Sequence, residues 1–579
     1  MSRYSFDLIR YSRPWKSTND KHIDYVIGLD TESDSDGKPF MFTFSDNFCC
    51  GPEDIPGIFF TDRYKDKDFG VWNLSYDSGS LLYNMPPGKR TELRESGKTN
   101  YKGYNYYYIP HKLLRISYKG SQVHVWDIMP FYSMSLDAAS IKYLKKQKIS
   151  MPTKTFTREY IDKHYWTIVD YSIHDAVLVA ELYDSFVKRI NSFGIYPRSL
   201  YSLASISLEY FKKNVKVVDV WYYWKYHREL LRYAFESYSG GKFEVYARGK
   251  FTGYEYDINS AFASAIADLY DITYCRLSTS ANYEPEATYG FIRCRIDNTK
   301  GDYIPVSYNN KYMCLYPCGI FNATITKEEY EYLIEYNIPV KIYSAFWLYP
   351  TTIRKPYKKI INNLHKLKYS FKETDLLNYH IVKGIMNTFY GKMVQAVEKP
   401  NGTYRAGSGW NIIYASIVTA HIRVMVTRLT KQYNTKVLAV HTDSIITTEK
   451  LPDSYVGTDL GKWSLVKSGP GVLIGSGIYT LADKNRFRGF YMKETFNWLK
   501  VLKDMKGKSK INVPQTVVKS WVQANFEGKD QDTNKFTEAI KEFNLNCDRK
   551  RGWGGKSTGN SLLKGLQWSF PVYVFDKES

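Results

Sequence analysis

The sequence KGIMNTFYG, residues 383–391, decides the fold of this chain. In a helix, Lys383, Asn387 and Tyr390 lie on one face, because they are spaced by four and then three residues. A second face is apolar and can pack against a core; it carries Val382, Ile385 and Phe389. The spacing therefore predicts a helix with one buried face and one face that is free to hold a ligand.

Two acidic strand ends flank this helix, Asp257 in YDINSAF and Asp443 in VHTDSII. If the fold brings both carboxylates together, they can hold a pair of Mg²⁺ ions that clamp the attacking and leaving oxygens of a phosphoryl transfer. The free helical face would then hold a triphosphate. Each piece alone has a plainer explanation, since such an aspartate is more often a turn residue and a helical lysine is usually solvated.

The N-terminal third contains a second set of carboxylates. The run from Tyr25 to Glu32 predicts a buried strand that points Asp30 and Glu32 to one face. Two carboxylates on one face repel each other unless a cation lies between them. Two further aspartates follow, Asp77 in NLSYD and Asp175 in YSIHD.

In this order, the residues resemble motifs A, B and C of the family B DNA polymerases, and the N-terminal set resembles that family's three exonuclease motifs. The resemblance covers the chain from about residue 25 to about residue 480. It implies a multidomain α/β and α+β fold. A ribonuclease-H-like 3′–5′ exonuclease domain would come first, followed by a right-hand polymerase of palm, fingers and thumb.

The resemblance also implies roles for the charged residues. In the polymerase, Asp257 and Asp443 would hold two Mg²⁺ ions, with Mn²⁺ as a substitute, and Lys383 would neutralise charge on the triphosphate. In the exonuclease, two more Mg²⁺ ions would be held by Asp30, Glu32, Asp77 and Asp175. Tyr171 would orient the attacking water there.

The resemblance to family B polymerases also implies which residues contact the nucleotide and the DNA. The nucleotide would be bound by Ser260, Phe262, Lys383, Asn387 and Tyr390, with the Phe262 ring excluding a ribose 2′-hydroxyl. A frayed single-stranded 3′ end would contact Asn73, Tyr76, Ser135, Leu136 and Lys154. DNA near the polymerase site would contact Tyr238, Gly240, Gly241 and Tyr479.

Two features resemble the protein-primed subgroup of this family, which serves certain phages, adenoviruses and linear plasmids. Asp257 and Lys383 are 126 positions apart, and residues 303–356 look like that subgroup's insertion. The segment Tyr238-Ser-Gly-Gly241 is similar to its Tyr-x-Gly-Gly linker. The resemblance implies three partners: primer-template DNA, deoxynucleoside triphosphates, and a terminal protein whose hydroxyl serves as primer.

Several departures from the family pattern keep other functions open. His441 stands where motif C usually has its first aspartate, either as a neutral hydrogen-bonding partner, which we favour, or as a ligand for a softer metal. Gly477 stands where a primer-holding lysine is usual. The alternatives are an RNA-primed or self-priming polymerase, an exonuclease with a decayed polymerase site, and a DNA-binding or packaging component in which both sites are relics.

Composition agrees with a nucleic-acid partner. Lys and Arg exceed Asp and Glu by 21 in the 579 residues, which favours binding to a polyanion. Of seven cysteines only Cys314 and Cys318 have a paired spacing, which indicates reduced thiols. No run approaches the ~18 apolar residues of a membrane helix. We therefore expect a soluble monomer in the cytoplasm, or in the host-cell cytoplasm if the source is viral.

The expected domains follow the motifs along the chain: exonuclease 1–190, palm 191–302, insertion 303–356, fingers 357–395, palm 396–490 and thumb 491–579. The stretch between Gly391 and Tyr414 is short where strand-displacing members carry a second insertion, so strong strand displacement is doubtful. In the thumb, residues 512–525 predict a helix with Pro514 in its first turn. Residues 549–556 predict a flexible basic loop.

Overall fold

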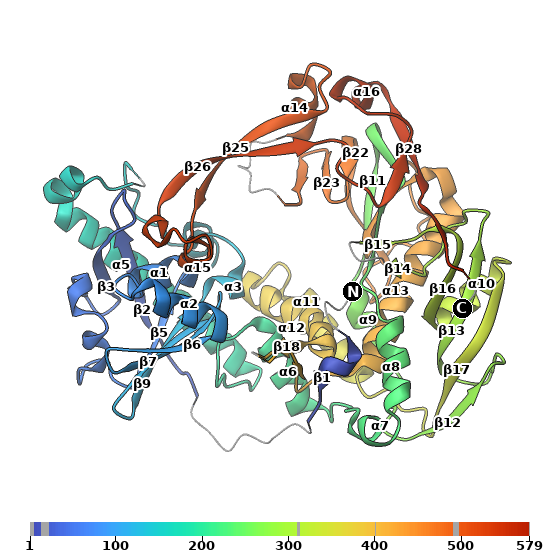
Figure 1. The fold of residues 1–579 in the computed structure, drawn as a ribbon, viewed down its shortest axis with the longest axis horizontal. Coiled ribbons are helices and arrows are strands. Elements are labelled where there is room, and N and C mark those ends of the chain that lie inside the picture. The colour runs from blue at the N-terminus through green and yellow to red at the C-terminus, as the bar shows by residue number, and fades with distance from the viewer. Residues whose placement is uncertain are drawn as a thin grey trace.

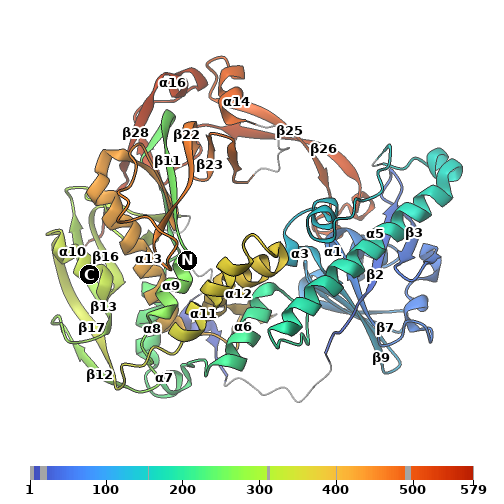
Figure 2. The same ribbon diagram turned by 180° about the vertical axis from the view of Figure 1, so that it is seen from behind.

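The computed structural model describes residues 5–12, 22–153, 155–309, 313–399, 401–489 and 497–577. Its ribbon closes into a ring in which an N-terminal unit and a larger C-terminal unit are joined by helices on one side and by a long β-hairpin on the other (Figures 1 and 2). Residues far apart in the sequence therefore meet across the ring. Palm, fingers, insertion and thumb name the segments predicted above, although two strands within residues 551–571 of the predicted thumb join the palm sheet.

The N-terminal unit is built on an eight-stranded sheet of order β4-β3-β2-β5-β9-β8-β7-β6. Strand β2 pairs with β5 in parallel and with β3 antiparallel. Helix α5 (Arg158–Ser192) crosses one face of the sheet (Figure 2), and helices α1 (Leu74–Leu81) and α2 (Pro87–Ser96) lie on the other (Figure 1). The strands are β2 (Ile27–Ser33), β3 (Pro39–Phe44), β4 (Phe48–Cys50), β5 (Asp68–Val71), β6 (Lys98–Tyr101), β7 (Tyr104–Ile109), β8 (Leu113–Tyr118) and β9 (Ser121–Asp127).

The palm is a nine-stranded sheet whose main path is β10-β20-β21-β11-β22-β23-β24. Its long central strand β11 bonds to β21 and β22 over most of its length and to β28 at its start. The strands are β10 (Lys242–Val245), β11 (Ala247–Ile258), β20 (Val437–Thr442), β21 (Ser444–Thr447), β22 (Trp463–Gly475), β23 (Ile478–Leu481), β24 (Lys484–Phe487), β27 (Arg551–Trp553) and β28 (Leu566–Pro571).

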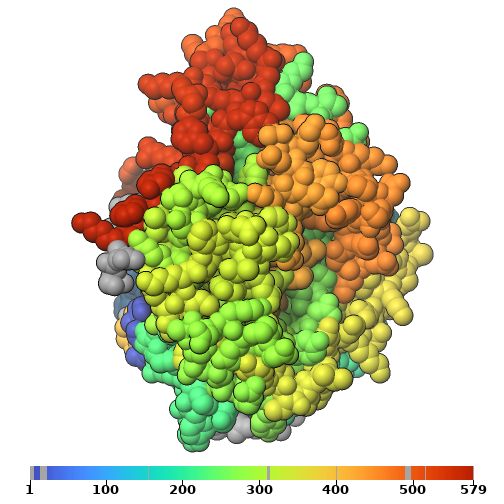
Figure 3. Space-filling view, turned by 90° about the vertical axis from the view of Figure 1, so that its right-hand side faces the viewer, coloured from blue at the N-terminus to red at the C-terminus, as the bar shows by residue number. Residues whose placement is uncertain are grey.

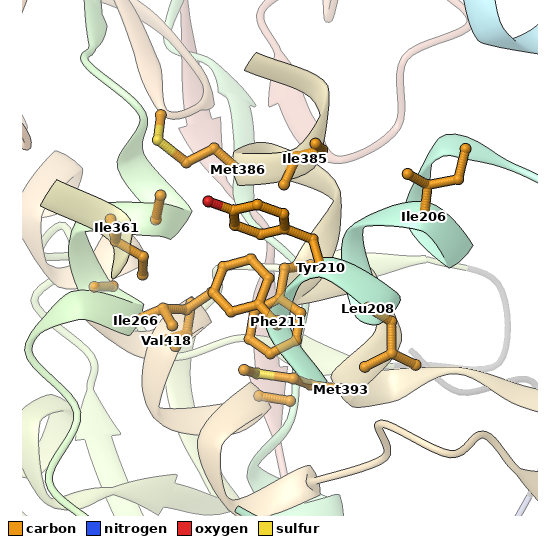
Figure 4. Close-up of a cluster of buried hydrophobic side chains, with 14 of the residues drawn as sticks. Ile206, Leu208, Tyr210, Phe211, Ile266, Ile361, Ile385, Met386, Met393 and Val418 are labelled. Carbon is orange, nitrogen blue, oxygen red and sulfur yellow. The ribbon is translucent and has the colours of Figure 1, made fainter. Parts of the chain in front are cut away.

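The fingers consist of two helices, α11 (Lys358–Phe371) and α12 (Leu376–Val394). Helix α6 (Leu203–Asn214) inserts Tyr210 and Phe211 between these helices and the palm helices α9 (Ala261–Ala267) and α13 (Ile412–Tyr433), as Figure 4 shows. The rings of Phe211 and Phe389 stack with their centroids 3.8 Å apart. The predicted helix over residues 383–391 is confirmed, because it lies inside α12 with the predicted apolar face buried.

Helix α13 is the one helix in the described ranges that passes a test for a membrane span by length and composition. Over Ile412–Lys436 its most apolar window has a mean hydropathy of 1.3. That window is 78% buried inside the protein. No such helix is expected from the sequence, and packing against the palm sheet accounts for its apolar surface.

The insertion forms a five-stranded sheet of order β12-β17-β13-β16-β29, covered by helix α10 (Lys327–Glu335). The sheet starts at Cys275, inside the segment expected to be palm, and its last strand comes from the C-terminal end of the chain. Figure 3 shows this C-terminal segment, in red, lying against the insertion. The strands are β12 (Cys275–Ser280), β13 (Tyr289–Asn298), β16 (Cys318–Thr326), β17 (Val340–Pro350) and β29 (Tyr573–Phe575).

The thumb differs from the prediction. Residues 510–518 form strand β25 (Lys510–Val518), which pairs with β26 (Phe536–Asn544) in a long hairpin, so the helix predicted over residues 512–525 is wrong for most of its length. Only its end is helical, as the short helix α15 (Trp521–Phe526) at the tip. The basic loop predicted at residues 549–556 is also wrong in part, because Arg551 begins β27 and is buried against Glu244.

Candidate active sites

The palm sheet brings Asp257 and Asp443 together. Strand β11 runs antiparallel to β21 with Asp257 directly opposite Ser444, and Asp443 occupies the tight turn between β20 and β21. The backbone N–H of Ile258 donates to the carbonyl of Asp443 at 2.9 Å. Two aspartates that are far apart in the sequence are therefore held side by side by backbone hydrogen bonds.

Both palm aspartates are electrostatically strained. Burial raises the pKa of Asp257 to about 7, with further increases from the carboxylates of Asp443 and Glu255. The charges of Lys383 and Lys484 act in the opposite direction. Burial also raises the pKa of Asp443. Such a pair of hard oxygen ligands in a poorly solvated place suits a divalent cation, whose charge would offset the cost of ionising both groups.

The fingers present two lysines to this place. Lys383 and Asn387 are exposed on α12, as the spacing predicted. Lys368 of α11 donates from Nζ to Ser260 Oγ at 3.0 Å. Burial, helped by the charges of Lys383 and Lys372, lowers the pKa of Lys368 to about 8. Sequence reasoning missed Lys368, because it is one of several lysines on an amphipathic helix and only the packing distinguishes it.

Aromatic residues lie next to the lysines. The rings of Phe262 and Tyr390 stack with centroids 4.7 Å apart, and the Tyr390 hydroxyl hydrogen-bonds the Tyr238 hydroxyl at 2.9 Å. Three of the predicted contact residues therefore lie together: Phe262 on α9, Tyr390 on α12, and Tyr238 in the segment Tyr238–Gly241, the linker. Ser260 precedes α9 with a left-handed backbone, φ 51°.

The linker that contains Tyr238 is pinned to the palm. Arg423 of α13 donates from Nη1 to the carbonyl of Ser239 at 2.7 Å and to that of Gly240 at 3.1 Å. A Cβ at Gly241 would lie 2.4 Å from Cγ2 of Thr442, the residue before Asp443. This glycine therefore lets the linker approach the turn that carries Asp443. That role differs from the contact with DNA expected for Gly241.

His441 is buried among basic side chains. Burial and the surrounding charges of Lys484, Arg488 and other basic residues lower the pKa of His441 to about 3, so its ring is neutral. Its Nε2 accepts a long hydrogen bond, 3.4 Å, from the backbone N–H of Gly477. A neutral hydrogen-bonding ring was the favoured reading of the sequence.

A carboxylate and an ammonium that sequence reasoning missed lie beside His441. Glu255 accepts from Lys484 Nζ at 2.6 Å and from the hydroxyl of Tyr479 at 2.8 Å. Tyr479, expected to contact DNA, is only 2% exposed, and its ring stacks on His441. Alternation along a strand places Glu255 two residues before Asp257 on the same face, so this signal was available in YEYD.

The N-terminal unit brings its four carboxylates to one place from three elements. Asp30 and Glu32 are on β2, Asp77 is on α1, and Asp175 is on α5. Burial and mutual repulsion raise the pKa of Asp30 to about 7 and hold the pKa values of Glu32 and Asp77 well above their ordinary range. Burial raises the pKa of Asp175 to about 6.

Short hydrogen bonds orient these carboxylates. The Ser172 hydroxyl donates to Asp30 Oδ2 at 2.7 Å, and the Thr31 hydroxyl donates to Asp77 Oδ1 at 3.0 Å. Asp175 Oδ1 is buried and has no hydrogen-bond partner. An unsatisfied buried oxygen next to three further carboxylates fits a site for a cation with oxygen ligands.

Lys148 is a further residue of this site that the sequence analysis did not select. It forms an ion pair with Asp175 and lies 4.7 Å from the ring centroid of Tyr171. Lys154, the lysine chosen from sequence, lies outside the described residues. Lys148 belongs to the run KKQK, in which four neighbouring residues offer little to separate one lysine from the next.

The remaining predicted contacts have structural partners. Asn73 is the N-cap residue of α1, and Tyr76 lies in its first turn. Ser135 caps the short helix α4 (Leu136–Ala139) by accepting from the N–H of Ala138 at 3.3 Å. Leu136 is buried in the core. These placements leave their predicted contacts with single-stranded DNA as predictions.

In the described part of the chain, no three His, Cys, Asp or Glu side chains are gathered tightly enough to enclose a metal ion as they stand. In the N-terminal site, Lys148 occupies part of the space around Asp175. The donor set nevertheless suits Mg²⁺ at both sites, because all its members are carboxylates whose ionised forms need a compensating cation.

The fold and its two acidic sites define a class: an exonuclease-type unit followed by a right-hand palm, fingers and thumb. The same fold occurs in Phi29 DNA polymerase complexed with primer-template DNA and incoming nucleotide substrates, with a TM-score of 0.60 and 14% identity over 90% of this chain and 100% of that chain. The binary complex of Phi29 DNA polymerase with primer-template DNA gives a TM-score of 0.61 at 14% identity, with the same coverage. The predicted fold class is confirmed.

The chain belongs to the family described as DNA polymerase type B, organellar and viral, whose profile matches residues 103–410, more than half of its length. A DNA polymerase of Acidianus bottle-shaped virus (isolate Italy/Pozzuoli) is 23% identical over 418 residues, which is 66% of this chain. The match spans 61% of that relative's length. The predicted membership of family B is confirmed.

Proposed function

We propose that the protein is a DNA-directed DNA polymerase with a 3′–5′ proofreading exonuclease, and that it replicates a linear viral or plasmid genome from a terminal-protein primer. The observation that carries the polymerase is the pairing of β11 with β21, which sets Asp257 beside Asp443. The charge of Lys383 lowers the pKa of Asp257, which supports a position of the fingers helix α12 near the two aspartates. Family membership supports the same activity.

In the proposed reaction, the primer 3′-oxygen forms a bond to the α-phosphorus of a deoxynucleoside triphosphate. The bond to the β-phosphate oxygen breaks, the 3′-hydroxyl proton is lost to solvent, and pyrophosphate leaves. Lys383 and Lys368 neutralise the charge on the leaving phosphates. Phe262 and Tyr390 frame the sugar and base. Asp257 and Asp443 would hold Mg²⁺, which when bound would stabilise the attacking and leaving oxygens.

In the N-terminal unit, the proposed reaction is hydrolysis of the last phosphodiester of a DNA strand. Water forms a bond to phosphorus, the bond to the 3′-oxygen of the preceding nucleotide breaks, and a nucleoside monophosphate leaves. Asp30, Glu32, Asp77 and Asp175 would hold Mg²⁺ here, with Mn²⁺ as a substitute at both sites. Tyr171, whose ring lies next to Lys148, would orient the water.

The test of both activities is extension of a labelled primer annealed to a longer template, in Mg²⁺, with or without the four deoxynucleotides. We expect full-length product with nucleotides and shortening without them. Shortening under both conditions would replace the proposal with an exonuclease whose polymerase site has decayed at His441 and Gly477. The absence of both reactions would remove the enzymatic proposal altogether.

Protein priming is a separate part of the proposal. It is supported by the insertion sheet between motifs A and B and by the Tyr238–Gly241 linker, which lies against the turn that carries Asp443. The purified terminal protein of the same genetic element should receive one labelled nucleotide in a bond that survives denaturing electrophoresis. If only an RNA primer or a self-primed end is extended, the priming mode is one of the alternatives.

We also propose that the enzyme works as a monomer in the cytoplasm, which is the host's if the source is viral. Light scattering of the protein with one equivalent of primer-template should give the mass of one 67.6 kDa chain plus DNA. A mass of two chains would overturn this part of the proposal.

A further inference from the structure

The tip of the thumb hairpin docks on the N-terminal unit, as the ring in Figure 1 shows. Trp521 of α15 is fully buried in the core of that unit, where its ring centroid lies 5.0 Å from that of Tyr108. Its Nε1 donates to Ser78 Oγ at 3.0 Å. A buried tryptophan with a satisfied N–H is the kind of anchor that dominates interface energetics.

Polar contacts fix the orientation of the docked tip. Asn525 donates to the carbonyl of Pro87 at 3.2 Å and accepts from the Thr91 hydroxyl at 3.2 Å. Arg90 forms a mostly buried ion pair with Asp530 at 3.4 Å. Two polar contacts and one charged contact around a central anchor allow a single docked arrangement.

A chain of hydrogen bonds leads from the tip to the exonuclease carboxylates. Asn534, which is 1% exposed, donates from Nδ2 to the carbonyl of Tyr76 at 3.0 Å and to Ser80 Oγ at 3.1 Å. Ser80 Oγ also accepts from the Thr31 hydroxyl at 3.1 Å. The single proton of this hydroxyl is shared between Ser80 Oγ and Asp77 Oδ1, which lies 3.0 Å from Thr31 Oγ1.

The backbone is shaped for this contact on both sides. Asn534 has a left-handed conformation, φ 62°, which asparagine tolerates better than most residues. A Cβ at Gly79 would lie 2.7 Å from Asn534 Oδ1, so the helix turn between Ser78 and Ser80 admits Asn534 because residue 79 has no side chain. Thr31, the end of the relay on β2, stands between Asp30 and Glu32 in sequence.

We propose that Asn534 of the thumb is a positioning residue of the exonuclease site. Through Ser80 and Thr31 it fixes the direction of the Asp77 carboxylate, and through the Tyr76 carbonyl it holds the first turn of α1. Docking of the thumb tip therefore completes the nuclease, whereas the palm aspartates do not depend on it. This inference rests on the proposed exonuclease function.

The test uses the full chain carrying Asn534→Ala, with Ser80→Ala as a second variant that breaks the same relay without altering the thumb. We expect each to lower the single-turnover rate of degradation of single-stranded DNA about 10-fold to 100-fold, the usual cost of losing a hydrogen bond that orients a metal-binding carboxylate. Primer extension should stay within twofold of the wild type. Because both variants break one relay, the double variant should be no worse than the more severe single variant.

The matched control is Thr91→Ala, which removes a docking hydrogen bond that is not part of the relay. Its nuclease rate should remain within twofold of the wild type. A second readout is binding of Mn²⁺ alone, measured by electron paramagnetic resonance in a background with Asp257→Asn and Asp443→Asn. Asn534→Ala and Ser80→Ala should weaken this binding several-fold, and Thr91→Ala should not.

Two outcomes would overturn the inference. In one, Asn534→Ala and Ser80→Ala retain wild-type nuclease rate and Mn²⁺ binding. In the other, nuclease and polymerase activities fall together in both variants, which would mean a general loss of structure. If the wild-type chain itself does not degrade single-stranded DNA, the failure lies with the proposed exonuclease and is visible before any variant is made.

Discussion

The proposed exonuclease site in the N-terminal unit and the proposed polymerase site in the palm both gather buried carboxylates, but they balance the negative charge differently. In the exonuclease site, Lys148 pairs directly with one of the predicted metal ligands, Asp175. In the palm, Lys484 pairs instead with Glu255, two residues from Asp257, and the predicted ligands carry no ion pair in the described structure.

The two arrangements keep their carboxylates close together by different means. The carboxylates of the proposed exonuclease site come from one strand and two helices. The ammonium group of Lys148 offsets part of their mutual repulsion. The palm aspartates are fixed by neighbouring strands, and their compensating lysines sit on the fingers and on β24.

The largest effect is expected for Asp443→Asn. This substitution removes one of two carboxylates from the palm pair, and loss of several kcal/mol of transition-state stabilisation corresponds to a decrease of about 1,000-fold in nucleotide incorporation. Degradation of single-stranded DNA should be unchanged. The control is Asp453→Asn, on an exposed palm loop, measured by the same primer extension. Equal loss of both activities would contradict the independence of the two sites.

The corresponding variant in the proposed exonuclease site is Asp175→Asn. It should lower nuclease activity about 100-fold and spare incorporation. We expect the loss to be smaller than for Asp443→Asn, because three carboxylates remain in the exonuclease site and only one remains in the palm. Asp162→Asn, on the exposed part of the same helix, is the matched control. A larger loss than that of Asp443→Asn would reverse this ranking.

A smaller effect is expected for Lys368→Ala. The Lys368 ammonium faces the place where the triphosphate is proposed to bind, and one charge-assisted hydrogen bond is worth roughly 10-fold in the KM for deoxynucleotides. The rate at saturating nucleotide should change less than KM. Lys366→Ala on the exposed face of the same helix provides the comparison. An unchanged KM would remove Lys368 from the nucleotide site.

The last prediction concerns the dependence of stability on pH in the absence of metal. Native Asp30 keeps its proton up to a pKa of about 7, against an ordinary value of 3.8, so the native state binds more protons than the unfolded state between these values. The free energy of unfolding in EDTA should therefore fall as pH rises from 4 to 7, by at most about 1.4 kcal/mol per pH unit for each such group.

Saturating Mg²⁺ should restore most of this stability at pH 7, because the cation binds the ionised carboxylates. Thermal unfolding of Asp30→Asn and Asp257→Asn will show which site contributes more, since the pKa of Asp257 is also raised to about 7. A stability that rises with pH over this interval would mean that the carboxylates are paired more strongly than their burial indicates.

The sequence predicted the local chemistry of the sites well. The helix over residues 383–391 follows from apolar spacing, and the acidic residues lie at strand ends and helix faces where periodicity placed them. Glu255 could have been found by the same alternation. Lys148 and Lys368 could not, because a lysine on a polar surface is selected only by what the fold brings against it.

The thumb hairpin is the clearest case of a segment whose structure could not be predicted from its sequence. The segment KINVPQTVV has a proline near its start and polar residues between apolar ones, so it matches a helix start as well as a strand. Its partner FTEAIKEFN has helical spacing of its own. Only the pairing of these two segments with each other and the anchoring of their tip by Trp521 select the strand, and both are long-range events.

The docking of Trp521 on residue 78 also sets an order of events during synthesis. The serine that receives the indole N–H precedes the tryptophan by 443 positions. At roughly 5–20 residues per second, the N-terminal sheet leaves the ribosome at least about 20 seconds before its last core side chain is made. A nascent chain therefore carries an N-terminal unit in which one core position is not yet filled and helix α1 is not yet held by the thumb tip. On the relay proposed above, the nuclease becomes fully competent only after the palm and thumb exist, so that degradation of DNA ends cannot precede the capacity to extend them.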